Sequence, residues 1–391
     1  MTSEICVMNR LAVVLAADSA TTVTQTTAEG TQQRYFKGAN KIFQLSHHHP
    51  VGLMIYDSAD ILNVPWEIVV KEFRSHLGTK SFNQLSGYAD EFFAFLQGNN
   101  RLFPEAVQKD RFLQAARGAA LKLLIPQDTK PDEAGRRAIA DAALAEGQAM
   151  VGGKPFADGL DAAFMTEIVL AWRDELVARN SEWIGYLNII GPTDLNALAD
   201  YGIEALLKSP GEFLGSTGLV FAGFGDNDIF PAMAPYKSLG IISGKHIAEI
   251  GRGMAIDHDT PAWLSAFAQT SMSDTFSLGV SYDVYSSLIG AVNQGLRDFA
   301  IELKAACGVD EAVPNNIDEI MKKASEAIGN AVLERAGTEH AQPLRRVLGV
   351  LPVDEMAELA ETLINLQSGV DPVSPDRRRL GLGTEAQELA W

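Results

Sequence analysis

The sequence predicts a layered α/β protein in which two sheets pack face to face and helices cover their outer faces. Strand-like apolar runs open the chain at residues 5–8 and 11–17, and they return past the middle at residues 218–224 and 239–242. Helical periodicity fills the region between these groups of strands and the last third of the chain. Strands at both places with helices between and after them indicate sheet-on-sheet packing.

Composition indicates a globular chain. The 391 residues are 47% apolar, and no apolar run reaches the roughly 20 residues that a membrane helix needs. The formal charge of −18 argues against nucleic acid as a partner, because phosphate binding needs clustered Lys and Arg. Cys6 and Cys307 are too few for a disulfide framework or a cysteine zinc site. With no secretory signal at the start, we expect a cytoplasmic protein that contacts no membrane.

The first two runs predict a β-hairpin that turns at Asn9 and Arg10. The hairpin would bring Thr2 and Asp18 together at one end of a sheet. Removal of Met1 would leave Thr2 with a hydroxyl and a free α-amine, whose ordinary pKa of about 7.7–8.0 lets it accept the hydroxyl proton. Thr2 would then be a nucleophile that carries its own base. The alternative is an ordinary Met-Thr start that leads into an edge strand.

The next segments predict further hairpins and a helix. Residues 19–33 are typical of a twisted strand pair or a loop closed near Gly30, and residues 41–45 and 51–56 predict a second hairpin. A helix with one apolar face is expected from Trp66 to Gly78. We expect residues 79–180 to form a helical insertion within a single domain that spans residues 1–391, because no clear linker separates them.

The second half continues with a turn and mainly helices. Residues 225–228 predict a hairpin turn, and residues 264–269 and 276–280 predict a strand pair followed by a helix from about Val284. Three helices should fill the last third. Residues 47–49, three adjacent histidines, are typical of a solvated loop, although metal binding by them stays open. We expect no metal and no cofactor.

The spacing of a few residues at the start resembles proteasome β-subunits and the related bacterial threonine peptidases, which are N-terminal nucleophile (Ntn) hydrolases. That family has an N-terminal threonine, an aspartate sixteen residues later, and a lysine that opens a strand of Lys-Ile/Leu-Phe/Tyr-Gln-Ile/Leu type. A glycine-containing turn follows the next strand. The corresponding residues here are Thr2, Asp18, Lys41 at the start of residues 41–45, and Asp57.

The far end of the chain adds a second similarity. Proteasome subunits have a helix that opens with Val-Asp-Glu, followed by an aspartate and, three residues later, a serine that both support the N-terminal amine. Residues 353–355 read Val-Asp-Glu here, and the family's spacing leads to Asp371 and Ser374. The resemblance covers residues 2–77 best, with further support near residues 219–230 and 353–374.

The resemblance implies a four-layer αββα Ntn-hydrolase sandwich, here with a large helical insertion. It implies that Lys41 places a cation beside the Thr2 hydroxyl and that Asp18 holds this lysine in its charged form. Asp371 and Ser374 would orient the α-amine. The simpler interpretation is that Asp18 and Lys41 form an ion pair at strand ends.

The resemblance also implies a peptide-binding edge and one conflict with the family. Backbone groups of Thr22, Asp57 and Ala59 would hold an extended peptide as an added strand, beside an apolar pocket that includes Thr21, Ile55 and Ala59. Asp57 stands where the family has the glycine whose N–H forms the oxyanion hole. A carboxylate there would repel the developing oxyanion.

Two further departures concern the length of the insertion and the end of the chain. Residues 78–180 are far longer than the corresponding part of a proteasome subunit, so the family's ring contacts do not carry over. After Ser374 the family continues through further apolar strands, and here no such strand is predicted, which would leave a sheet incomplete.

We therefore expect a threonine-type amide hydrolase, acting as a peptidase on peptide or protein substrates. A homo-oligomer and an ATP-driven unfoldase are the partners that the resemblance suggests. One alternative is a non-proteolytic amidohydrolase of the same superfamily that acts on a small amide. Another is a catalytically inactive scaffold whose helical insertion binds a partner.

Overall fold

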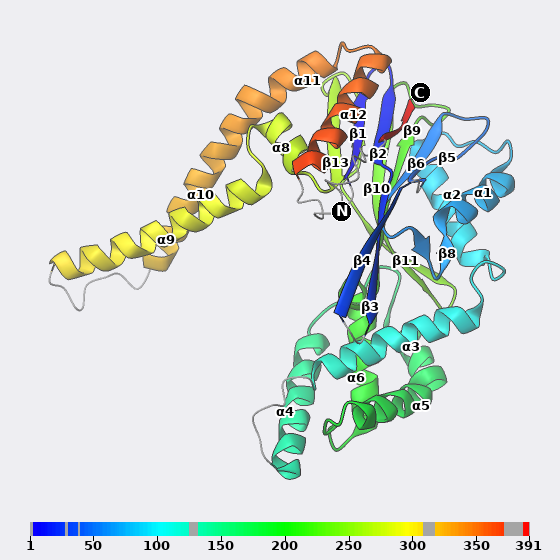
Figure 1. The fold of residues 1–391 in the computed structure, drawn as a ribbon, viewed down its shortest axis with the longest axis vertical. Helices are drawn as coiled ribbons and strands as arrows, with labels where there is room; N and C mark the ends of the chain where they lie inside the picture. The colour runs from blue at the N-terminus through cyan, green and yellow to red at the C-terminus, as the bar shows by residue number, and fades with distance from the viewer. Residues whose placement is uncertain are drawn as a thin grey trace.

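The computed structural model describes residues 3–27, 30–37, 40–124, 132–307, 317–370 and 386–390. Figure 1 shows a central body of sheets, a lobe of helices below it, and a long helical arm that leaves the body on one side. The predicted mixed α/β class is confirmed, because antiparallel sheets and helices both build the body.

The first sheet contains the first and the last strand that the structure describes. Its strands are β1 (Ser3–Asn9), β2 (Val13–Asp18), β13 (Ala262–Ala268) and β14 (Ala386–Ala390), in the order β13-β1-β2-β14. The predicted hairpin is confirmed: the Asn9 Oδ1 atom accepts the backbone N–H groups of Leu11 and Ala12, and its Nδ2 donates to the carbonyls of Leu348 and Leu351. The expectation that no strand follows Ser374 was wrong, because β14 pairs with β2 along its length.

The second sheet lies behind the first. Its strand order is β11-β10-β9-β6-β5, with a short β12 paired to β10. The bounds are β5 (Ile42–Gln44), β6 (Val51–Asp57), β9 (Thr217–Gly223), β10 (Ala232–Ile242), β11 (Lys245–Ile250) and β12 (Met254–Ala255). The predicted second hairpin is β5 with β6, and the predicted turn at residues 225–228 joins β9 to β10. A β-bulge between Ser238 and Gly240 interrupts the pairing of β10 with β11.

Three apolar clusters hold the layers together. Cys6, Met8 and Leu15 of the first sheet pack against Met54 and Val220 of the second. On the other side of the first sheet lies α12 (Val353–Val370), which packs against β1 and β2. Helices α1 (Trp66–Leu77) and α2 (Leu85–Gly98) cover the outer face of the second sheet. The packing order is therefore helix, sheet, sheet, helix.

Two strand pairs stand outside these sheets. The ribbon of β3 (Ala20–Thr27) and β4 (Gly30–Lys37) confirms the strand pair predicted around Gly30. Figure 1 shows this ribbon crossing the body toward the lower lobe. A very short pair, β7 (Asp60–Ile61) with β8 (Val64–Pro65), joins β6 to α1.

The lower lobe contains the helices between β8 and β9 that follow α2. They are α3 (Glu105–Lys122), α4 (Glu133–Gly152), α5 (Ala162–Tyr186), α6 (Leu195–Lys208) and α7 (Pro210–Phe213). Asp132, Asp161 and Asp194 cap the N-termini of α4, α5 and α6 by accepting backbone N–H groups. Helix α2 differs from the others because its buried side chains join the core beneath the second sheet.

Between β13 and residue 370, the described elements are all helices. Residues 308–316 lie outside the described part of the chain. It forms α8 (Ser271–Leu278), α9 (Tyr282–Cys307), α10 (Ile317–Ala336), a π-helical turn (Gly337–Ala341), α11 (Gln342–Leu348) and α12. The strand predicted for residues 276–280 was wrong. Thr270 Oγ1 donates to the Asp274 carboxylate in the first turn of α8, and Gly279, at φ 76°, ends this helix.

Candidate functional site

A buried cluster of three charged residues lies at one end of the layer between the sheets. Lys41 Nζ donates to Glu4 Oε1 at 3.1 Å and to Asp18 Oδ1. Exposure is 6% for Lys41, 0% for Glu4 and 3% for Asp18, so all three groups are removed from water. The structure thus brings together Asp18 and Lys41, as predicted, and adds Glu4 to them.

The hairpin and the second sheet fix the positions of these side chains. In β1, Glu4 is two residues before Cys6, which faces the second sheet, and the strand register sets Glu4 opposite Ala17 on β2. Asp18 is the last residue of β2. The Lys41 carbonyl accepts the Ile55 N–H at 2.8 Å, so β6 holds the backbone from which the lysine reaches the first sheet.

The cluster contains one ammonium group and two carboxyl groups. Burial raises the pKa of Glu4 to about 8; the charge of Lys41 lowers this pKa, while that of Asp18 raises it further. Near neutral pH the cluster is therefore closest to electrical balance when Glu4 holds a proton. Glu4 Oε2 is buried and has no hydrogen-bond partner among the described residues.

Asp57 ends β6 in a backbone conformation that favours glycine. Its φ is 69°, in the left-handed region, where most residues with a Cβ are strained. Partial burial raises the pKa of Asp57, and the charge of Lys237 opposes this. The Asp57 charge in turn raises the pKa of Glu4, so this carboxylate lies within electrostatic reach of the buried cluster.

The other predicted site residues are only partly placed. Ile55 is buried in the core on the helix-covered face of the second sheet, and Ala59 is exposed in the turn after β6. Thr21 and Thr22 belong to β3, opposite Phe36 and Tyr35. Three predicted catalytic residues lie outside the described residues; they are Thr2, Asp371 and Ser374.

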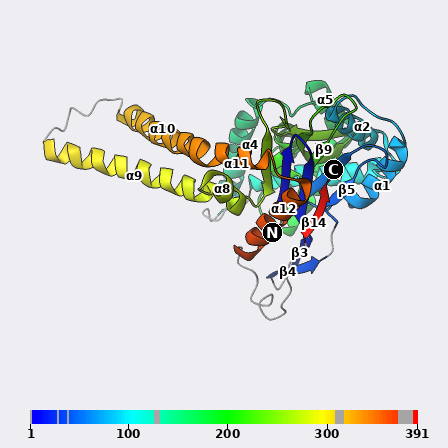
Figure 2. The ribbon, with the colours of Figure 1, turned by 90° about the horizontal axis from the view of Figure 1, so that it is seen from above.

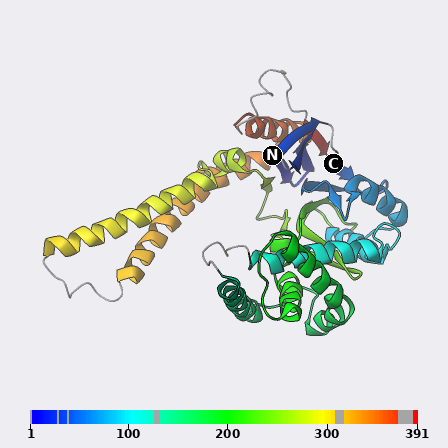
Figure 3. The ribbon, with the colours of Figure 1, turned by 60° about the horizontal axis from the view of Figure 1, so that its bottom comes forward.

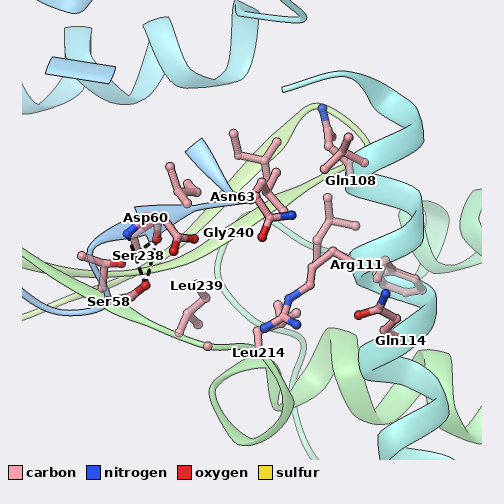
Figure 4. Close-up of a pocket in the computed structure, with 18 of the residues that line it drawn as sticks. Ser58, Asp60, Asn63, Gln108, Arg111, Gln114, Leu214, Ser238, Leu239 and Gly240 are labelled. Atoms are coloured by element: carbon pink, nitrogen blue, oxygen red, sulfur yellow. Dashed lines mark hydrogen bonds between the residues drawn. The ribbon is translucent and has the colours of Figure 1, made fainter. Parts of the chain in front are cut away.

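A cavity of about 350 Å³ is lined in part by Ser58, the residue directly after Asp57. Helix α3 forms one wall and the bulged part of β10 forms another. Figure 4 shows Arg111 and Gln114 reaching in from α3, while Asp60 and Asn63 come from the opposite wall. The volume is within the range of small-ligand pockets.

The charged groups of this cavity are available to a ligand. Neither the Arg111 guanidinium nor the Asp60 carboxylate has a hydrogen-bond or ion-pair partner among the residues that the structure describes. Asp110, which also lines the cavity, pairs instead with Arg179 at 2.8 Å. The guanidinium fits a ligand carboxylate, and the Asn63 amide can add hydrogen bonds, whereas the Gln114 amide already donates to Asp110 at 2.8 Å.

The sequence contained a signal for Glu4 but hardly any for the cavity. A glutamate in a strand that also carries Cys6 and Met8 on its sheet-facing side would be buried, and a buried carboxyl group needs a cation or a proton. The lining residues of the cavity come from four separate parts of the chain, so no local pattern marks them.

Comparison of the chain with protein-family models, with curated proteins and with solved structures gave no match. Among the described residues, no group of three or more His, Cys, Asp or Glu side chains is placed to hold a metal ion. In the same part of the chain, no helix is both long and apolar enough to cross a membrane. Any function therefore rests on the geometry and chemistry of the chain's own residues.

Glu4→Gln should remove a pH dependence of stability. The folded state binds the Glu4 proton more tightly than the unfolded state, so raising the pH from about 4.5 to 8 destabilises the wild type. The free energy of unfolding of Glu4→Gln, minus that of the wild type, should increase across this window by up to about 1.4 kcal/mol per pH unit. Above the window this difference should stay constant. Urea denaturation at matched pH values measures the difference.

The matched control is Glu72→Gln, because Glu72 forms an exposed ion pair with Arg101 on the protein surface. Its stability difference from the wild type should stay small across the same pH range. A pH-independent difference for Glu4→Gln would contradict the assignment of a raised pKa to the buried carboxyl group.

Proposed function

We propose that the protein is a threonine-type amide hydrolase of the Ntn type, acting as a peptidase through Thr2 after removal of Met1. The observation that carries the proposal is the buried contact of Lys41 with Asp18 and Glu4, located at the end of the hairpin whose first strand begins at Ser3. The helix, sheet, sheet, helix order of packing supports assignment to the four-layer αββα class.

The alternation of side chains along β1 supports the placement of Thr2. Glu4, Cys6 and Met8 are spaced two residues apart, and the latter two face the second sheet. A strand continued by one residue would direct Thr2 to the same face as Glu4, toward Lys41. An ammonium group next to the hydroxyl would favour the alkoxide that forms during attack.

The proposed reaction is an acyl transfer in two steps. The Thr2 α-amine takes the hydroxyl proton while Oγ1 bonds to the substrate carbonyl carbon, and the carbonyl oxygen becomes an oxyanion facing the Asp57 N–H. The C–N bond then breaks, and the leaving amine takes the proton from the α-amine. Water attacks the resulting threonine ester with the same amine as base, which releases the acid and restores Thr2.

Asp371 and Ser374 would orient the α-amine in this mechanism, as the resemblance implies. Backbone groups of Thr22, Asp57 and Ala59 would hold the substrate as an extended strand. The cavity lined in part by Ser58 lies next along this edge, so it would receive a side chain of the substrate. Arg111, which has no ion-pair partner among the described residues, supports a preference for an acidic side chain there.

The first test is Thr2→Ala, with Thr2→Ser as the matched variant that keeps a hydroxyl. Thr2→Ala should lower the rate of amide hydrolysis by at least about a thousandfold, because no other group replaces the nucleophile. Thr2→Ser should retain measurable activity. Rates are measured on untagged protein with the N-terminus established by intact mass. Undiminished hydrolysis by Thr2→Ala would disprove the mechanism, and retained Met1 would favour the scaffold alternative.

Asp57→Gly should raise the rate. A carboxylate about 5 Å from the oxyanion, at an effective dielectric constant near 20, repels it by about 3 kcal/mol, or roughly a hundredfold in rate. Asp57→Asn removes the same charge but keeps a Cβ at the positive φ, so it separates charge from backbone strain. Single-turnover rates of both variants are compared with the wild type. A fall in both rates would show that the carboxylate takes part in catalysis.

Arg111→Gln should change selectivity and leave the chemistry intact. For a pair of peptide amides that differ only by Glu or Gln next to the scissile bond, kcat/KM for the Glu peptide should fall about tenfold, the loss expected for one charge-assisted contact. The value for the Gln peptide should change little. A wild-type preference for the Gln peptide over the Glu peptide would instead assign the selectivity to Asp60.

A further inference from the structure

The helical arm projects away from the rest of the described structure. It contains α9 and α10, which run antiparallel and extend away from the sheets in all three views (Figures 1, 2 and 3). With 26 residues, α9 is about 39 Å long at a rise of 1.5 Å per residue. Near its root, the arm contacts α8 and the π-helical turn.

The two helices of the arm bury little of each other. On α9, the side chains that face α10 recur every three or four residues, yet they are only half-buried; they are Tyr285, Ile289, Val292 and Leu296. On α10, the buried positions are Ser325, Gly329 and Ala336, which are all small. Two helices joined by so narrow a contact are marginal by themselves, because most helical stability comes from packing an apolar face.

Each helix carries a second apolar stripe beside the first. On α9 it contains Val284, Leu288, Ala291, Gly295 and Phe299, spaced by three or four residues. Exposure is 56% at Val284, 45% at Leu288 and 63% at Phe299, so nothing in the described structure covers the large members.

The stripe on α10 has the same spacing and smaller side chains. It contains Ile320, Ala324, Ala327 and Ala331, and Ile320 is 51% exposed. Because the two helices are antiparallel and right-handed, both stripes turn to the same side of the arm. Together they form one face, the arm face, with large side chains mainly on α9 and small ones mainly on α10.

The size of the arm face fits a second copy of the same surface. Over the 20 residues of α10, about 30 Å, a face two helices wide covers about 600 Å² on each partner. Two such faces would bury about 1,200 Å², the lower limit for a specific protein interface. In an antiparallel pair the two-fold axis sets α9 against α9 of the other copy, so Phe299 of one copy would lie near the small residues Ala291 and Gly295 of the other, as in the core of a four-helix bundle.

Charge also permits a second copy as the partner of the arm face. The two helices carry five basic and seven acidic side chains, a net charge of −2, whereas the whole chain carries −18. On α10, Lys322 and Glu326 stand away from the arm face, whereas Glu334, three residues after Ala331, lies at its edge. Two arms can therefore approach with little repulsion, because their net charge is small.

We propose that the protein is a homodimer in which two arms pack antiparallel through their arm faces, forming a four-helix bundle with two-fold symmetry. A closed two-fold contact covers both arm faces and leaves no free copy of the surface. This proposal does not depend on the chemistry of Thr2.

The test is the molar mass of the full chain in solution, measured by light scattering over about a hundredfold range of concentration. The wild type should have the mass of a dimer and should dissociate on dilution. Leu288→Glu and Phe299→Glu each bury a charge in the proposed interface and should raise the dissociation constant at least tenfold. Ser286→Glu adds the same charge to the exposed polar side of α9, away from the arm face, and should leave the dimer unchanged.

A cross-linking experiment tests the antiparallel arrangement without weakening the interface. Gly295 lies at the middle of α9. If the two-fold axis of the antiparallel pair passes through this point, Gly295 of one copy lies next to Gly295 of the other. Gly295→Cys should therefore form a covalent dimer on mild oxidation, and Ser286→Cys, near the root and outside the arm face, should not. A wild type that is monomeric at all concentrations would overturn the proposal. A dimer that survives both glutamate variants would place the interface elsewhere.

Discussion

The architecture of the body depends on the burial of one ammonium group between two carboxyl groups. Glu4 and Asp18 come from two strands of the first sheet, and Lys41 directly precedes β5 of the second, so their contacts exist only if both sheets are correctly placed. A shift of one residue in β1 would turn Glu4 toward α12 and leave Lys41 with one fewer partner. Removing a partner from a buried ionic group costs about 3–5 kcal/mol, which makes this end of the sandwich sensitive to misalignment.

The opposite end of the hairpin is held by Asn9 in a complementary way. This fully buried side chain accepts two N–H groups of its own turn and donates to two carbonyls near the start of α12. The first sheet is thus fixed to the second sheet at one end by charge and to its covering helix at the other end by hydrogen bonds. Between these points, the alternate side chains of β1 and β2 fill the two apolar clusters.

The sequence predicted those parts of the fold that local patterns determine. The two early hairpins, the strands near residues 220 and 240, and α1 all follow from alternation, helical periodicity and turn residues. The strand predicted at residues 276–280 failed because Thr270 and Asp274 start a helix and Gly279 ends it, and these local contacts outweigh the apolar residues between them. β14 could not be predicted from the sequence, because its five residues contain only one large apolar side chain and its pairing with β2 is long-range.

The same distinction between local patterns and long-range contacts applies to the candidate site. The resemblance to the Ntn family predicts Asp18 and Lys41, whereas Glu4 belongs to no motif of that resemblance and its partner is 37 residues away. The positive φ of Asp57 matches a position where a glycine was expected, yet no sequence pattern reports a backbone angle for an aspartate. The cavity at Ser58 joins the turn after β6 to α3 and the bulge of β10, and only the tertiary structure brings these segments together.

The lower lobe and the arm contact different parts of the body. The roles proposed for them, substrate selection by the lobe and dimer formation by the arm, are therefore separate. Helix α3 of the lower lobe lines the cavity that starts beside Asp57, so changes in this helix would alter the pocket that the proposed hydrolase offers to a substrate. The arm instead connects through α8 to Gln367 of α12, which accepts the Met272 N–H at 2.8 Å, and to β13, whose Ala268 pairs with Ser3. The root of the arm is therefore one strand away from Ser3.

The contacts between the root of the arm and β1 do not by themselves couple dimer formation to the proposed active site. Coupling requires an element with two alternative arrangements whose populations both sites shift. The contacts between the arm and β1 run through buried packing and ladder hydrogen bonds, which have a single arrangement in this structure. On the structure described here, dimer formation would stiffen the segment beside Ser3 without changing which residues face Lys41. Assembly and chemistry can then be varied independently, one through the arm face and the other through the turn and cavity at the end of β6.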